Sequence, residues 1–215
     1  RKEKILIFGK RFLADLDVDI SASFESNSYN KMVMAGIKFL RYLVKFDPDY
    51  LKKMDKSLWE KWTPPLLIYP VFNPYDDEAY KNLIDLANVM GKSSFRDTVK
   101  KKLLSEGKSE NGNFFILDKI KRFINLDFAK ELFEFVENEE FPVMRNISIL
   151  GKLIGFGVSE AEDKVKTLIS SFLNNSNENR GNIISALSCL FWNSKTAGWD
   201  YIYPIFLKDM ELVRD

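Results

Sequence analysis

Apolar residues recur every three or four positions along almost the whole chain, and this spacing constrains the fold more than any other feature. Val33, Ile37, Leu40 and Val44 form one such stripe, whereas the strict alternation expected of strands is scarce. The periodic segments are each about three to five helical turns long, and short turns separate them, so that successive helices are expected to lie antiparallel. The sequence therefore predicts an all-α protein, an α-solenoid of stacked antiparallel helix pairs.

Two stretches interrupt this period and suggest how the chain is divided. Residues 63–75 contain Pro64, Pro65, Pro70 and Pro74, so we expect a rigid connector through which no helix runs. Residues 105–113 are rich in Gly, Ser and Asn, which favours an exposed loop. The expected organisation is a helical region over 1–104, the loop, and helical repeats over 114–215. The charged start and the helix that would begin near Leu212 suggest a segment of a longer polypeptide.

The C-terminal half aligns with itself at an offset of about 36 residues. Phe133, Ile169 and Ile205 coincide at this offset, as do other apolar pairs. Arginine is a rarer residue here and recurs at nearly the same interval, as Arg145, Arg180 and Arg214. A fixed period of this length is typical of a protein in which similar helix pairs stack on one another.

The segment from Glu139 to Arg145, followed by Ile147 and Leu150, resembles the turn and second helix of a HEAT repeat. Residues 209–214 resemble the same passage in a later repeat, whereas residues 174–180 lack the expected Val and acidic residue. The resemblance covers about residues 127–215. It implies a solenoid of the HEAT or armadillo type, in which the recurrent arginines hold adjacent repeats together, or alternatively form a ladder of ligand-binding residues.

The chain has no His and only one Cys, Cys189. These absences exclude Ser-His-Asp and Cys-His catalysis, His- or Cys-ligated metals and an intrachain disulfide. Gly91-Lys92-Ser93 lacks the earlier glycine and the preceding strand of a phosphate loop. We therefore expect no enzyme activity and no cofactor within this segment. The near absence of Cys fits a reducing compartment, the cytoplasm or the nucleus, and no apolar run is long enough for a membrane span.

Two groups of residues are candidates for contacting a partner. Trp59, Trp62, Trp192 and Trp199 lie near predicted helix ends, where we expect them to pack between helices, with surface anchoring as the alternative. The second group is a run of cations around one predicted helix, which is either a solvated face or a patch for an acidic partner or a phosphate backbone: Lys92, Arg96, Lys100, Lys101, Lys102 and Lys108.

These observations favour a non-enzymatic interaction module, a scaffold or sensor region that binds a protein. The formal charge of +1 lacks the basic excess of a nucleic-acid binder, but binding through residues 92–108 remains an alternative. A further alternative is the helical sensor region of a multidomain nucleotide-driven switch, such as a prokaryotic defence ATPase. No membrane partner is expected.

Overall fold

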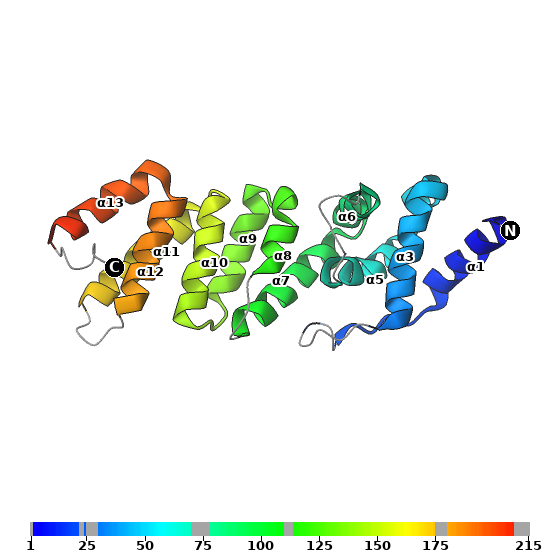
Figure 1. Ribbon diagram of the computed structural model, residues 1–215, viewed down its shortest axis with the longest axis horizontal. Helices are drawn as coiled ribbons and strands as arrows, with labels where there is room; N and C mark the ends of the chain where they lie inside the picture. The colour runs from blue at the N-terminus through cyan, green and yellow to red at the C-terminus, as the bar shows by residue number, and fades with distance from the viewer. Residues whose placement is uncertain are drawn as a thin grey trace. The chain divides into compact units, whose positions relative to one another are not determined.

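The computed structural model describes residues 2–21, 24, 30–69, 78–109, 114–174 and 180–208, which contain helices and no strand (Figure 1). The all-α prediction is therefore confirmed for the part of the chain that is described. The chain divides into two compact units, Arg1–Ser105 and Glu106–Asp215. None of the described helices is both long enough and apolar enough to cross a lipid bilayer.

Unit 1 is built around one helix that packs on four others. That central helix is α3 (Lys31–Phe46), and the others that contact it are α1 (Lys2–Asp15), α4 (Pro48–Lys53), α5 (Lys56–Ile68) and α6 (Glu78–Met90). The next helix, α7 (Lys92–Lys108), begins directly after the turn at Gly91 and continues into the first residues of unit 2.

Two tryptophans of α5 form the centre of unit 1. Trp59 and Trp62 are fully buried, and their indole N–H groups donate to the carbonyls of Leu51 (3.2 Å) and Leu13 (3.0 Å). A Cβ atom on Gly36 of α3 would lie 1.9 Å from Cη2 of Trp62, so the absence of a side chain there lets the indole ring pack against α3. The prediction that these two tryptophans pack between helices is confirmed.

The prediction that no helix runs through residues 63–75 is wrong for its first part. Helix α5 includes Pro64 and Pro65 and ends at Ile68. Pro64 has no N–H to offer the carbonyl of Glu60 one turn earlier, but the Ser94 hydroxyl of α7 donates to that carbonyl at 2.8 Å. A side chain from another helix thus replaces one hydrogen bond that proline removes. Residues 70–75 of the expected connector lie outside the described residues.

This replacement gives a testable prediction for Ser94→Ala. The substitution leaves the Glu60 carbonyl without its donor and should reduce the free energy of unfolding by about 1 kcal/mol. In a Pro64→Ala background, the restored backbone N–H can bond to the same carbonyl, so the cost of Ser94→Ala should fall close to zero. Urea unfolding of the four proteins measures this difference. An equal cost in both backgrounds would contradict the assignment.

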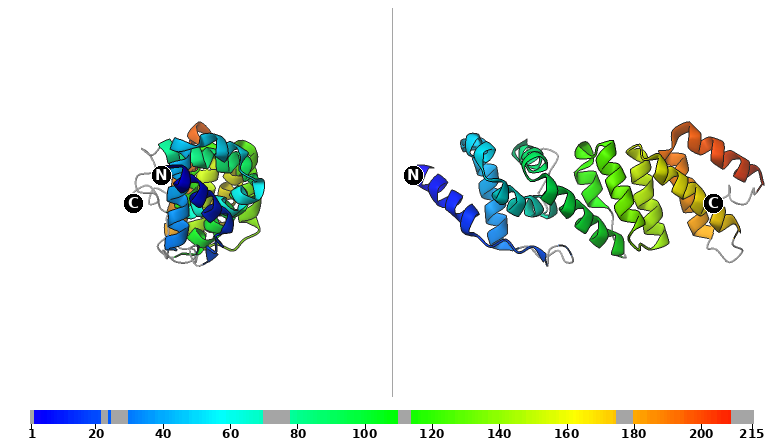
Figure 2. Two further views of the ribbon diagram at one scale, coloured as in Figure 1. Left: turned by 90° about the vertical axis from the view of Figure 1, so that its right-hand side faces the viewer. Right: turned by 180° about the vertical axis from the view of Figure 1, so that it is seen from behind.

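Unit 2 is a stack in which each long helix contacts the next one or two along the chain (Figure 2). The described helices that begin in unit 2 are α8 (Phe115–Lys119), the 3-10 helix η1 (Lys121–Phe123), α9 (Leu126–Glu137), α10 (Val143–Gly155), α11 (Ser159–Asn174), α12 (Arg180–Asn193) and α13 (Lys195–Lys208). Helix α10 packs on α9, α11 and α12, and α12 also packs on α11 and α13. Two segments that align at the offset of about 36 residues, α10 and α12, are therefore neighbours in space.

Ion pairs link α9 to α11 across this stack. Lys130 lies 2.8 Å from Glu160, and Glu137 lies 2.9 Å from Lys164. The hydrogen bond from Lys130 lowers the pKa of Glu160 to about 2. Because this pKa is lowered, any stabilisation from the pair is present at neutral pH and is lost as the pH falls toward 2. Both side chains are exposed, so the contribution is small.

The predicted exposed loop at 105–113 is wrong for its first four residues, which continue α7 to Lys108. Glu106 is only 7% exposed, and its Oε2 accepts the backbone N–H of Ile116 at 3.2 Å. A Cβ on Gly107 would lie 2.3 Å from Cε1 of Phe141. The polar and small residues that suggested a loop therefore cap α8 and make room for an aromatic ring. Residues 110–113 lie outside the described part of the chain.

Candidate interaction surface

The six cations predicted as an interaction patch all lie on α7, but they do not form one open face. Lys92, Lys101 and Lys108 are exposed, and at about 100° per residue Lys92 and Lys101 lie on opposite sides of the helix. Arg96 and Lys100 are half-buried and already interact within the chain. Lys102 is half-buried. The ammonium group of Lys108 lies 3.9 Å from the carboxylate of Glu139, with which it forms an ion pair.

The recurrent arginines lie near the starts of two neighbouring helices. Arg145 is the third residue of α10, and its guanidinium carbon lies 6.0 Å from the centre of the Phe114 ring. Arg180 is the first residue of α12, is exposed, and also interacts within the chain. Arg214 lies outside the described residues. Arg145 therefore contributes to packing within unit 2.

The most distinctive surface of unit 2 is a continuous group of aromatic rings at the junction of α12 and α13. The Phe191 ring meets Trp192 at 5.0 Å and Trp199 at 5.9 Å between ring centres. Trp199 in turn meets Tyr203 at 5.5 Å and Phe206 at 6.3 Å. We call these five residues the aromatic surface. It joins rings from two helices into one patch.

Much of this patch is open to solvent. Trp192 is 78% exposed, Trp199 is 42% exposed and Tyr203 is 48% exposed, and Phe191 is exposed as well. Leu207, on the same helix as Tyr203, adds a further exposed apolar side chain. A tryptophan with most of its surface in water is uncommon in a folded domain, and contiguous apolar patches of this kind mark sites of interaction.

The geometry of α13 explains why these rings face outward. Ile202 is fully buried, and the Tyr201 hydroxyl donates to the backbone carbonyl of Lys166 on α11 at 3.0 Å, so this side of α13 faces the stack. Trp199 and Tyr203 are four residues apart and share a face of α13 that lies opposite Tyr201 and beside Ile202. A Cβ on Gly198 would lie 2.6 Å from the carbonyl oxygen of Leu190, so glycine lets the start of α13 approach the end of α12.

The sequence-based expectation for Trp192 and Trp199 is therefore wrong, because neither ring is enclosed between helices. One feature of the sequence bears on these two tryptophans, namely the apolar composition of α12. Helix α12 carries apolar residues on every side, which is typical of a helix surrounded by protein. In the described residues α12 packs on α10, α11 and α13, and these neighbours leave Phe191 and Trp192 of its last turn exposed.

Among the described residues the one cysteine is enclosed, and no cluster of metal-ligating side chains occurs. The single cysteine, Cys189, is buried between α12 and α10, and its thiol donates to the carbonyl of Ile147 at 3.5 Å. Burial raises the pKa of this thiol to about 12. No group of three or more Cys, Asp or Glu side chains that could hold a metal ion occurs among the described residues.

No protein-family model, no curated protein and no solved structure matches the chain.

Proposed function

We propose that the chain is a non-enzymatic helical-repeat module that binds a protein through the aromatic surface of α12 and α13. The observation that carries this proposal is the exposure of Trp192 at one end of a connected group of rings. Tryptophan and tyrosine are the residues that most often dominate the energy of protein interfaces, because they bury a large area and lose little conformational entropy.

The charge around the aromatic surface favours a protein over a nucleic acid. Between residues 184 and 207 the sequence contains one cation, Lys195, and one anion, Asp200. A nucleic-acid site would need several cations to contact the phosphate backbone, even where aromatic rings stack on the bases. The occupant that fits is an apolar, uncharged segment of a partner protein.

The same features support an interaction role over catalysis. The chain lacks histidine, and its one thiol is buried with a raised pKa. The stack of unit 2 holds α12 and α13 through fully buried residues such as Leu190 and Ile202. A rigid platform that presents preformed aromatic anchors loses little entropy when it binds.

The experiment compares three forms of the protein as affinity baits: the unchanged chain, Trp192→Ser and Phe115→Ser. Phe115 is 65% exposed and lies on α8 in the same unit, so it is a matched control for loss of an exposed aromatic ring. A protein retained by the unchanged chain and by Phe115→Ser, but not by Trp192→Ser, is then purified. Its affinity is measured directly by calorimetry.

We expect Trp192→Ser to weaken the purified partner's affinity at least about tenfold, the usual effect at an interface hot spot. The Phe115→Ser variant should bind like the unchanged chain, and both variants should unfold at the same temperature. Equal loss in both variants, or no loss in either, would overturn the proposal. Binding of RNA or DNA that weakens steeply with salt and is unaffected by Trp192→Ser would point instead to the cations of α7.

A further inference from the structure

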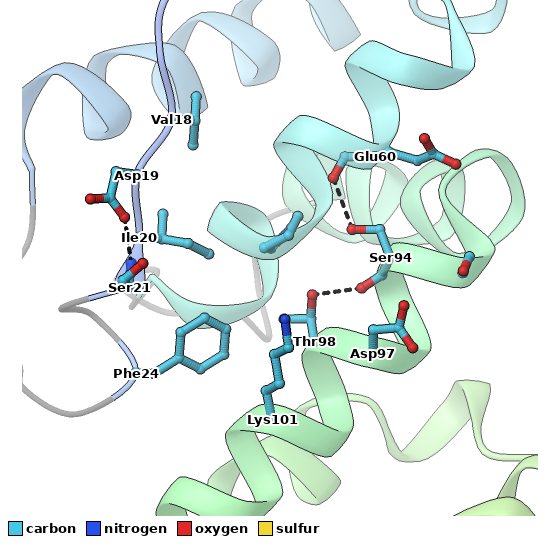
Figure 3. A pocket seen from close by; sticks show the side chains of 12 residues that line it. Val18, Asp19, Ile20, Ser21, Phe24, Glu60, Ser94, Asp97, Thr98 and Lys101 are labelled. Atoms are coloured by element: carbon cyan, nitrogen blue, oxygen red, sulfur yellow. Dashed lines mark hydrogen bonds between the residues drawn. The ribbon is translucent and has the colours of Figure 1, made fainter.

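Unit 1 contains a cavity of about 500 Å³ that the proposed function does not use. It lies between residues 18–21 with Phe24, the part of α5 from Glu60 to Pro64, and the part of α7 from Ser93 to Lys101 (Figure 3). This volume is within the range of about 300–1,000 Å³ that is usual for small-molecule sites. The cavity has two chemically different sides, and these sides restrict what it can hold.

One side of the cavity is apolar. Val18, Ile20 and Phe24 line it from the segment that follows α1, and Pro64 lines it from α5. In Figure 3 the side chains of Ile20 and Phe24 lie across the cavity from α7. This side can accept an aliphatic or aromatic body, whose transfer out of water is favourable by about 25 cal/mol for each Å² buried.

The opposite side presents one ammonium group, that of Lys101. Its side chain extends from α7 toward the space beside Ile20 and Phe24 (Figure 3). Among the described residues, Lys101 makes no ion pair and no hydrogen bond. A lysine that points into a cavity with an apolar side is suited to a single negative charge on a ligand.

The hydroxyl groups of Ser94 and Thr98, which also line the cavity, already donate hydrogen bonds to backbone carbonyls. Ser94 donates to the Glu60 carbonyl at 2.8 Å, and Thr98 donates to the Ser94 carbonyl at 2.6 Å. Each hydroxyl can therefore only accept a hydrogen bond from a ligand. Lys101 is therefore the charged donor on this side of the cavity, and an acceptor group of a ligand would bind to its ammonium group.

Three carboxylates limit how much negative charge a ligand can carry. Asp19, Glu60 and Asp97 also line the cavity. The backbone N–H of Ser21 donates to Asp19 at 2.9 Å and lowers the pKa of Asp19, so this group is ionised at neutral pH. In Figure 3 the carboxylates of Asp19, Glu60 and Asp97 point away from the Lys101 nitrogen. Their repulsion increases with the negative charge of a ligand, so a doubly charged ion such as phosphate is disfavoured more strongly than a single carboxylate.

We propose that this cavity binds a small monocarboxylate with an apolar body, whose carboxylate pairs with Lys101 and whose body packs against Ile20 and Phe24. The inference is independent of the aromatic surface, which belongs to unit 2 and shares no residue with the cavity. A ligand of this kind would combine one charge-assisted hydrogen bond with burial of its chain.

Calorimetry on the full chain with octanoate, octan-1-ol and inorganic phosphate tests the proposal. Two variants are compared, Lys101→Met and Lys102→Met. They remove the same charge from adjacent positions of α7, but only Lys101 lines the cavity. Octanoate should bind the unchanged chain and Lys102→Met equally and should bind Lys101→Met at least about tenfold more weakly. Octan-1-ol should bind the unchanged chain and Lys101→Met with the same, weaker affinity.

Three results would overturn the assignment. They are equal binding of octanoate to both lysine variants, binding of phosphate as tight as that of octanoate, and no binding of octanoate at millimolar concentration. Trp192→Ser serves as a further control, because octanoate could also adhere to the aromatic surface. Octanoate affinity that falls in this variant and not in Lys101→Met would place the ligand on unit 2 and reject the cavity. A negative result with octanoate would leave the proposed protein interaction unaffected, because that interaction depends on the aromatic surface of unit 2.

Discussion

Replacing Gly36 by alanine should reduce the free energy of unfolding by about 2 kcal/mol, as expected for an overpacked core position. The added Cβ would lie 1.9 Å from Cη2 of Trp62, which is far inside van der Waals contact. Trp62 cannot withdraw easily, because it is fully buried and its indole N–H is bonded to the Leu13 carbonyl. Alanine is intrinsically the better helix former by about 1 kcal/mol, so the clash must exceed that gain for the expected loss to appear.

Three further variants separate the clash from other effects. Gly155→Ala is the matched control, since the nearest atom to its added Cβ would be 3.8 Å away, and this variant should be neutral or slightly stabilising. In a Trp62→Leu background the atoms that meet Gly36 are gone, so Gly36→Ala should become stabilising. Urea unfolding measures the free energies of the five proteins, including the unchanged chain and Trp62→Leu alone. A loss of stability from Gly36→Ala that persists in the Trp62→Leu background would contradict this account of α3 and α5.

The helical architecture was predictable because its signal is local. The spacing of residues such as Val33, Ile37 and Leu40 depends only on 3.6 residues per turn, and all three are buried on α3. The same reasoning holds for α9, α10 and α11, where one apolar stripe faces the neighbouring helices. A fold assembled from amphipathic helices therefore reveals its class in the sequence before any contact is known.

The two wrong boundaries depend on partners distant in the sequence. Pro64 can remain inside α5 because Ser94, on another helix, donates to the carbonyl that proline leaves open. Gly107 and Glu106 belong to α7 because Phe141 and the start of α8 lie against them. Propensity describes a residue without these neighbours, so the sequence pattern indicates a break where the folded protein has none.

The candidate surfaces show the same limit. Trp62 and Trp192 both lie on apolar helices, yet one is fully buried and the other is the most exposed tryptophan among the described residues. The difference arises from how many helices surround each ring, which periodicity does not report. The cavity was also invisible in the sequence, because Lys101 faces Ile20 and Phe24 only after α7 packs beside the segment that follows α1.

The thiol of Cys189 should react with iodoacetamide about a thousand times more slowly in the folded protein than in urea-unfolded protein at pH 8. The thiolate is the reacting species. Burial raises the pKa of this thiol from 9.0 to about 12, which lowers the thiolate fraction at pH 8 by about three orders of magnitude. The sulfur also packs close to α10, where a Cβ on Gly151 would lie 3.0 Å from it, so that the reagent has no direct approach.

The control places a cysteine three residues further along the same helix. In Cys189→Ala/Trp192→Cys the new thiol occupies the most exposed position of the aromatic surface, and it should react at the rate of the unfolded chain. The folded protein should also lose stability as the pH rises from about 9 to about 12, because only the unfolded thiol ionises in that window. Rapid modification of Cys189 at pH 8, without loss of helical circular dichroism, would show that the contact between α10 and α12 opens in the native state. That result would contradict the close packing of unit 2, on which the proposed binding platform rests.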